Sequence, residues 1–183
     1  MIVSATQRSA STIFCVEKAK ELGLKFGNQI IDGNWRGYSG PKSAWHEYKG
    51  PAVESTSFMD VIDYYDRRDD YVILDHSAHH LILQQSDYFV SRRNLIGAAA
   101  SMVKIMESRQ NPKAFIDVTV NIFLYRAFEF YMFCLEYGKD IIWTDDTRTF
   151  NTMEGSSHLR DKIQEYVSFG EFPDIVKTYN LKI

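Results

Sequence analysis

Near its N-terminus the sequence reads IVSATQRSAST at residues 2–12. The apolar run at residues 2–5 predicts a buried strand, and the small polar residues after it predict a tight turn. Residues 11–22 carry apolar side chains at helical spacing and are followed by Gly23, a typical helix stop. A strand, a turn and a helix in this order are typical of an α/β fold with a parallel sheet.

The rest of the chain continues this alternation of short apolar runs and longer helical patterns. We expect a small, mostly parallel sheet with helices on both faces, which makes three α/β/α layers. Ligands of such sheets bind beyond the carboxyl ends of the strands, here Ala5, Asp75, Ser91 and Trp143. Further strands are expected at residues 29–32, 71–75, 88–91 and 141–143, and further helices at 58–65, 95–107, 112–137 and 157–167.

Composition limits the classes of protein to be considered. The 183 residues fit one domain, and 45% hydrophobic residues are enough for a packed core. The 21 basic and 24 acidic side chains leave a net charge of -3, which disfavours a nucleic-acid binder. Two cysteines, Cys15 and Cys134, exclude a disulfide framework and a cysteine-based zinc site. There is no signal-peptide pattern, and polar residues interrupt the apolar stretch 118–135, so we expect a soluble cytoplasmic protein without membrane contact.

Residues 6–12, TQRSAST, have the composition of an anion-binding turn. The N–H groups of such a turn and of the following helix carry partial positive charge, and the guanidinium of Arg8 suits phosphate or sulfate oxygens. The frame matches the ATP-binding loop GxxxxGK[ST], but alanines replace both glycines and Ser11 replaces the lysine, which disfavours ATP hydrolysis. An ordinary turn capped by Ser9 or Ser11 is the alternative.

A second segment combines arginines and a hydroxyl group after a predicted strand. The strand at 88–91 runs into Arg92 and Arg93, and Ser101 stands eight residues after Arg93 on the following helix. Small residues in between permit a close approach to the backbone. Arg93 and Ser101 could converge on a phosphate, and Arg8, Arg92 and Arg93 together on one small polyanion. A solvated arginine pair and an ordinary helix serine are the alternative.

Together these segments resemble the signatures of sulfotransferases that use 3′-phosphoadenosine-5′-phosphosulfate (PAPS). The first signature of that family is TxRSGST after a strand, and residues 6–12 match it except that Ala10 replaces the glycine. The second is R[DN]P with a serine eight residues after the arginine. Arg93, Asn94 and Ser101 match it, with leucine in place of the proline.

Two later segments extend the resemblance. DHS at residues 75–77 stands where the family has its catalytic histidine, and TDD at residues 144–146 resembles the acidic end of a later strand. Order and spacing agree from residue 1 to about residue 150. The resemblance implies a single sulfotransferase-like domain of P-loop type over residues 1–183, in which residues 33–56 form a loop on the acceptor side.

The resemblance also implies a role for each matched residue. The amides of residues 9–12, together with Arg8, would hold the 5′-phosphosulfate, and Arg93 with Ser101 the 3′-phosphate. Arg8 would stabilise charge on the departing phosphate, and His76 would be the general base for sulfuryl transfer to a hydroxyl or amine. The chemistry needs no metal in the family. The residues expected to bind PAPS are Arg8, Ser9, Ala10, Ser11, Thr12, Arg93 and Ser101. If position 10 requires a positive φ, alanine is strained there.

Several alternatives stay open at this point. A nucleotide or small-molecule kinase that uses Arg8 in place of the lysine is one, and a catalytically lapsed nucleotide-binding module is another. Glu47 or Asp75 could replace His76 as the base. The cluster of Asp75 with histidines 76, 79 and 80 could bind zinc, although no further cysteine or histidine supports this except His46 and His158. The aromatic residues within 33–56 could form a platform for a small-molecule or carbohydrate acceptor, or simply anchor the loop. The sequence does not fix the oligomeric state.

Overall fold

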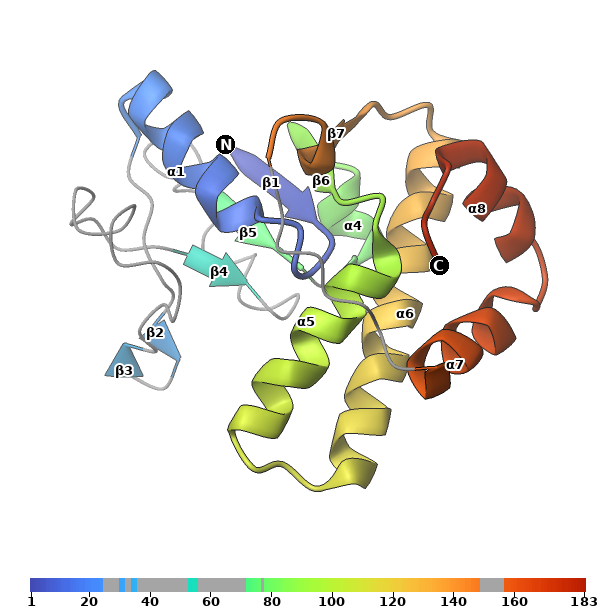
Figure 1. Cartoon of the computed structure of the whole chain (residues 1–183). Helices are drawn as coiled ribbons and strands as arrows, with labels where there is room; N and C mark the ends of the chain where they lie inside the picture. Colours follow the sequence, from blue (N-terminus) through green and yellow to red (C-terminus); the bar gives the residue numbers. More distant parts are fainter. Residues whose placement is uncertain (25–29, 32–33, 36–52, 56–71, 77, 149–156) are drawn as a thin grey trace. The chain divides into compact units, whose positions relative to one another are not determined.

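Figure 1 presents the chain as a computed structural model, which describes residues 1–24, 30–31, 34–35, 53–55, 72–76, 78–148 and 157–183. The chain groups into two compact units. Unit 1 comprises residues 1–5 and 10–90, and unit 2 comprises residues 6–9 and 91–183. The helix expected at 58–65 and most of the loop at 33–56 lie outside the described residues. The single sulfotransferase-like domain over residues 1–183 stays a prediction.

Unit 1 contains a parallel sheet of four strands in the order β4-β5-β1-β6, so the expected α/β class is confirmed. All four residues of β1 are buried, as its apolar sequence predicts. The register pairs Ser4 with Asp75 and Ala5 with Val90, and therefore the carboxyl ends of three strands lie at one edge. The strands are β1 (Ile2–Ala5), β4 (Val53–Ser55), β5 (Ile73–Asp75) and β6 (Tyr88–Ser91).

Helix α1 (Ser11–Leu22) begins and ends where the sequence pattern predicts. Gly23 ends it with φ 69°, and its N–H donates to carbonyl groups of the last turn. The half-buried Phe14 meets the ring of Tyr88 edge-on with centroids 5.7 Å apart. Strand β2 (Ile30–Ile31) lies within the strand expected at 29–32 and pairs antiparallel with β3 (Asn34–Trp35). Strands β3 and β4 lie within residues 33–56, so the expectation of a loop is wrong at residues 34–35 and 53–55. The short helix α4 (His80–Leu83) was not predicted.

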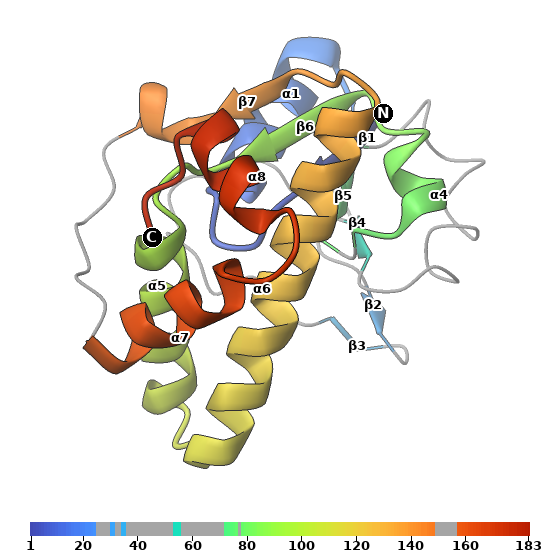
Figure 2. The ribbon, with the colours of Figure 1, turned by 90° about the vertical axis from the view of Figure 1, so that its right-hand side faces the viewer.

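Unit 2 is mostly helical. Its long helices α5 (Leu95–Ser108) and α6 (Lys113–Glu136) lie side by side, as Figures 1 and 2 both show. Helix α7 (Ser157–Val167) packs against α5, and α8 (Phe172–Tyr179) against α6. The strand β7 (Ile141–Trp143) and the 3-10 turn η2 (Thr144–Asp146) follow α6. All of these except α8 and η2 were predicted from the sequence.

Aromatic side chains fill the core of unit 2. The rings of Phe128 and of Phe172 in α8 pack at a tilt with centroids 4.6 Å apart, and the buried Tyr131 stacks on Trp143 with centroids 6.2 Å apart. Helix α6 is long and apolar enough, by length and composition alone, to cross a membrane. Half of its most apolar stretch of 18 residues is buried inside the structure, and core helices of soluble proteins pass the same test. The expected cytoplasmic location stays a prediction.

Candidate functional site

The turn between β1 and α1 ends in the conformation of an anion-binding turn. Ala10 precedes the helix with φ 57° and ψ 22°, in the left-handed region, and Ser11 begins the helix. A left-handed residue followed by a helical one directs consecutive N–H groups toward one side. Within the described part of the chain no side chain caps α1, and Ser9 Oγ donates instead to the Thr6 carbonyl at 2.7 Å. Neither Ser9 nor Ser11 is therefore the cap, and the strain expected for alanine applies.

Arg8 connects the same turn to helix α5 within unit 2. Its Nε and Nη2 both donate to Ser101 Oγ, at 3.1 and 2.9 Å. Arg8 is exposed and also has a positive φ of 62°. The sequence analysis assigned Arg8 and Ser101 to the two ends of one ligand, and the structure brings these two side chains together.

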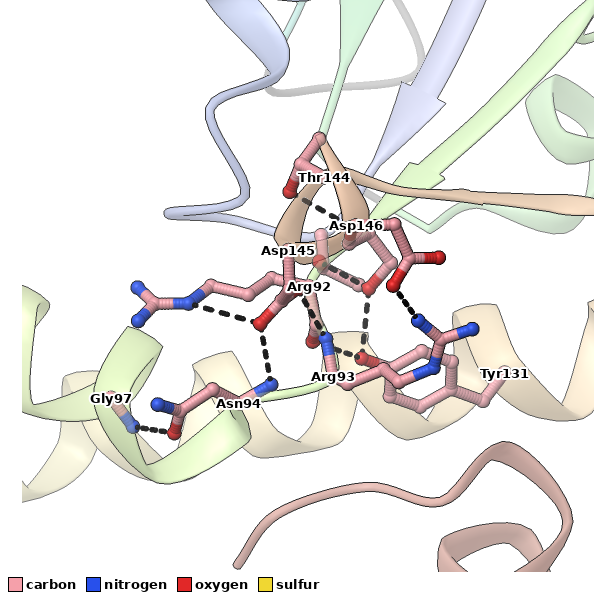
Figure 3. Close-up of polar contacts among 10 residues, drawn as sticks. Arg92, Arg93, Asn94, Gly97, Tyr131, Thr144, Asp145 and Asp146 are labelled. Carbon is pink, nitrogen blue, oxygen red and sulfur yellow. Dashed lines mark hydrogen bonds and ion pairs between the residues drawn. The ribbon is translucent and has the colours of Figure 1, made fainter. Parts of the chain in front are cut away.

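The two arginines that follow β6 point apart (Figure 3). Arg93 forms an ion pair with Asp146, and its guanidinium carbon lies 4.5 Å from the ring centroid of Trp143. Arg92 is buried, with 5% of its surface exposed, and its Nε lies 3.7 Å from Asp145 Oδ2. The expected convergence of three arginines on one polyanion is therefore not seen: Arg93 is directed toward Trp143 and Asp146.

Asp145 fills the turn between β6 and α5 (Figure 3). Its two oxygens accept hydrogen bonds from the backbone N–H of Arg93 at 2.8 Å and of Asn94 at 3.2 Å. Asn94 caps the helix, since its Oδ1 accepts from the Gly97 N–H at 2.8 Å. Side chains of the protein thus occupy the N–H groups that an external anion would bind at this turn.

The guanidinium of Arg92 lies against the first turn of α5. A Cβ atom added at Gly97 would stand 2.8 Å from Arg92 Nη2, closer than real Cβ atoms come. Burial lowers the pKa of Arg92, and the positive charge of Arg8 lowers that pKa as well, while Asp145 acts in the opposite direction. Arg8 and Arg92 are consequently near enough to repel each other.

Ser91, at the end of β6, joins several segments of unit 2. Its hydroxyl lies 2.8 Å from Thr6 Oγ1 and 2.8 Å from the Tyr131 hydroxyl, and its carbonyl accepts from Thr144 Oγ1 at 3.1 Å. The residues that follow β1 and β7 thus meet at the end of β6, as the rule for strand ends predicts. Burial raises the pKa of Tyr131, although its hydrogen bonds to Ser91 and Thr6 act in the opposite direction.

His76 lies at the carboxyl end of β1 in unit 1. Its Nδ1 is 2.8 Å from the carbonyl oxygen of Ala5. A carbonyl oxygen only accepts, so Nδ1 carries the hydrogen, and in the neutral ring the lone pair is on Nε2. His79 and His80 are exposed, and among the described residues no three His, Cys, Asp or Glu side chains are arranged to hold a metal ion.

Arg93 also faces a cavity of about 480 Å³ in unit 2. Lys182, near the C-terminus, is fixed beside it, because the Lys182 N–H donates to the Arg93 carbonyl at 2.8 Å. The Lys182 carbonyl in turn accepts from the Ile96 N–H at 3.1 Å. The other lining residues are Trp143, Asp145, Asp146, Thr178, Tyr179 and Asn180.

The sequence analysis missed the acidic partners of the two arginines. A signal for them exists: an Arg-Arg pair follows β6 and an Asp-Asp pair follows Thr144, and both segments were expected at the same edge of the sheet. Matching the opposite charges would have predicted these ion pairs. It would not have predicted the contact between Arg8 and Ser101, which depends on how far the turn extends.

Comparisons of the chain with protein-family models, with curated proteins and with solved structures found no match. The fold and the site define the protein only as an α/β protein with a parallel sheet and with polar side chains at the carboxyl edge of its strands.

Proposed function

We propose that the protein is a PAPS-dependent sulfotransferase with a P-loop-type, three-layer α/β/α fold. The contact between Arg8 and Ser101 carries the proposal, because it joins the two segments that resemble the PAPS signatures. PAPS bears its 5′ and 3′ phosphate groups on a single ribose. Residues that bind these two groups must therefore lie close together, although they are 93 positions apart in the chain.

The turn before α1 supports the binding part of the proposal. The left-handed Ala10 and the helix that starts at Ser11 present N–H groups without a side-chain cap among the described residues. Such groups, with the helix dipole, stabilise a phosphate or sulfate. The amides of residues 9–12 would hold the phosphosulfate, and Arg8 would add charge-assisted hydrogen bonds.

In the proposed reaction a sulfuryl group passes from PAPS to a hydroxyl or amine of a small-molecule or carbohydrate acceptor. The acceptor atom bonds to sulfur as the bond from sulfur to the phosphate oxygen breaks. Nε2 of His76 would take the acceptor's proton, since the Ala5 carbonyl holds the hydrogen on Nδ1. Arg8 would stabilise the negative charge on the departing phosphate. No metal is required, and we expect the reaction to take place in the cytoplasm.

Ligand-induced stabilisation tests the binding step. A ligand that binds only the folded state at 100 times its Kd raises the free energy of unfolding by about 2.7 kcal/mol. We expect 3′,5′-adenosine bisphosphate to raise the melting temperature and magnesium-ATP to have little effect. Arg8→Ala should abolish most of the shift. A larger shift with magnesium-ATP would favour a kinase and overturn the sulfotransferase proposal.

Turnover tests the role of His76. With PAPS and a panel of phenols, sugars and amines, His76→Ala should keep the shift caused by the bisphosphate and lose sulfuryl transfer. His80→Ala, which changes an exposed histidine a few residues away, is the matched control and should retain both. Transfer that survives in His76→Ala would move the base to an acid such as Asp75 or Glu47. Binding without transfer by the unmodified protein on any acceptor would favour a lapsed module.

A further inference from the structure

We propose that Arg92, and not Arg93, is the second guanidinium of the anion site, and that it binds the 3′-phosphate together with Arg8 and Ser101. The inference rests on the proposed function, since it assigns a residue to the same ligand. It departs from the resemblance, which places Arg93 in this role. Four observations within unit 2 carry it.

The first observation is the direction of Arg93. Its guanidinium is paired with Asp146 and lies over Trp143, at 4.5 Å from the ring centroid. The side chain lines the cavity that Tyr179 and Lys182 also line. To reach a ligand held by Ser101, Arg93 would have to leave both the ion pair and the aromatic ring.

The second observation is the placement of Arg92 along α5. Its Nη2 is close enough to Gly97 to exclude a Cβ atom there. Gly97 and Ser101 are four residues apart, so they lie on one face of the helix about 6 Å from each other along its axis. Because Arg8 donates to Ser101, the two guanidiniums lie about one helical turn apart on the same face.

The third observation is the distribution of charge. Asp146 pairs with Arg93, and Asp145 Oδ2 lies 3.7 Å from Arg92 Nε. Burial is the main cause that lowers the pKa of Arg92, and the positive charge of Arg8 lowers it further, so the two guanidiniums repel each other. A phosphate that bridges Arg8 and Arg92 removes this repulsion and gains charge-assisted hydrogen bonds.

The fourth observation concerns how Arg92 is held. With 5% of its surface exposed and Asp145 Oδ2 at 3.7 Å from its Nε, the guanidinium has little freedom to move. An arginine fork that is fixed before the ligand arrives loses less side-chain entropy on binding. Asp145 is therefore a positioning residue for Arg92, and Gly97 is the residue that leaves space for it.

The test compares two ligands in titration calorimetry: 3′,5′-adenosine bisphosphate and adenosine 5′-monophosphate, which lacks the 3′-phosphate. The measured quantity is the ratio of their dissociation constants. Arg92→Lys and Arg93→Lys make the same chemical change one residue apart. Arg92→Lys should reduce the preference for the bisphosphate about tenfold or more, and Arg93→Lys should leave it within about threefold.

Gly97→Ala supports the test if Arg92→Lys does not fold. Alanine is favoured in a helix, and its Cβ would displace Arg92 Nη2 and the neighbouring Asn94 amide without removing a charge. We expect the preference for the bisphosphate to fall in Gly97→Ala and to persist in Asn94→Ala. Loss of the preference in Arg93→Lys, or its retention in both Arg92→Lys and Gly97→Ala, overturns the assignment to Arg92. Absence of any preference in the unmodified protein overturns the proposed function instead.

Discussion

The two strand-to-helix turns of this protein are filled in opposite ways. The turn from β1 to α1 ends with a left-handed Ala10, and α1 has no side-chain cap in the described part of the chain. The turn from β6 to α5 is occupied by the protein's own side chains: Asp145 accepts from two backbone N–H groups, and Asn94 caps the helix. Among the described residues, the backbone N–H groups of the first turn have no side-chain cap, whereas those of the second turn are bonded to Asp145 and Asn94.

In the proposed function, the two turns would contribute different donors to the ligand. At the first turn the backbone supplies the donors, as in phosphate-binding loops. At the second turn the carboxylate of Asp145 stands where an anion would otherwise lie, so only side chains such as Arg92 and Ser101 remain to bind a ligand.

The largest expected effect follows from removing Asp145. Asp145→Ala leaves two backbone N–H groups and the buried Arg92 without this carboxylate. We expect the free energy of unfolding, measured by urea denaturation, to fall by about 3 kcal/mol. If Asp145 indeed fills the second turn as an internal anion, phosphate or sulfate at millimolar concentration should restore part of this loss.

Asp146→Ala is the matched control. Asp146 is 58% exposed and pairs only on the surface with Arg93 in the contacts described above, whereas Asp145 is 24% exposed. Exposed ion pairs contribute about 0–1 kcal/mol, so Asp146→Ala should have a small effect. Equal losses in the two variants would contradict the contrast between the turns.

Much of the fold could be predicted from local sequence, because the apolar runs of β1, β6 and β7 are bounded by turn residues and the pattern of α1 ends at a glycine. Helix α8 was missed because it is short and follows Gly170 closely. Its Phe172, Ile175 and Tyr179 have helical spacing, and Pro173 stands at the start, so a signal was present.

The site could be predicted only in part. The resemblance selected the segments, and the possible strain at Ala10 followed from the missing glycine. The pairing of each arginine could not be predicted in this way, because adjacent residues such as Arg92 and Arg93 have identical chemistry. Their directions depend on Gly97, Trp143 and Asp146, which lie far away or on another element.

An effect of intermediate size is expected at Tyr131, whose hydroxyl supports Ser91 at the start of the second turn. Tyr131→Phe should lower the free energy of unfolding at pH 7 by about 1 kcal/mol. Burial raises the pKa of Tyr131, so above pH ~10 the unfolded chain releases this proton while the folded protein keeps it. The stability contributed by the buried tyrosine is thus present below pH ~10 and decreases above it by about 1.4 kcal/mol per pH unit.

The wild-type protein and Tyr131→Phe should therefore have equal free energies of unfolding near pH ~11. Urea denaturation of both proteins from pH 7 to pH 11 measures this difference. A difference that stays constant over the whole range would mean that the hydroxyl is not buried in the folded protein. The contacts of Ser91 would then not support the second turn in the way described.

The smallest expected effect concerns the strain of the first turn. A left-handed conformation costs alanine about 1–2 kcal/mol relative to its usual region, whereas glycine adopts it freely but loses about 0.5–1 kcal/mol more entropy on folding. Ala10→Gly should therefore raise the free energy of unfolding by about 0.5 kcal/mol. Ala98→Gly makes the same change inside α5 and should lower it by about 1 kcal/mol, because helical φ gives glycine no advantage. Thermal unfolding of both variants measures the two changes in the free energy of unfolding. Changes of opposite sign would locate the strain at Ala10, in the turn whose N–H groups we assign to the ligand. Equal destabilisation by both variants would mean that Ala10 is not strained and would remove this distinction between the two turns.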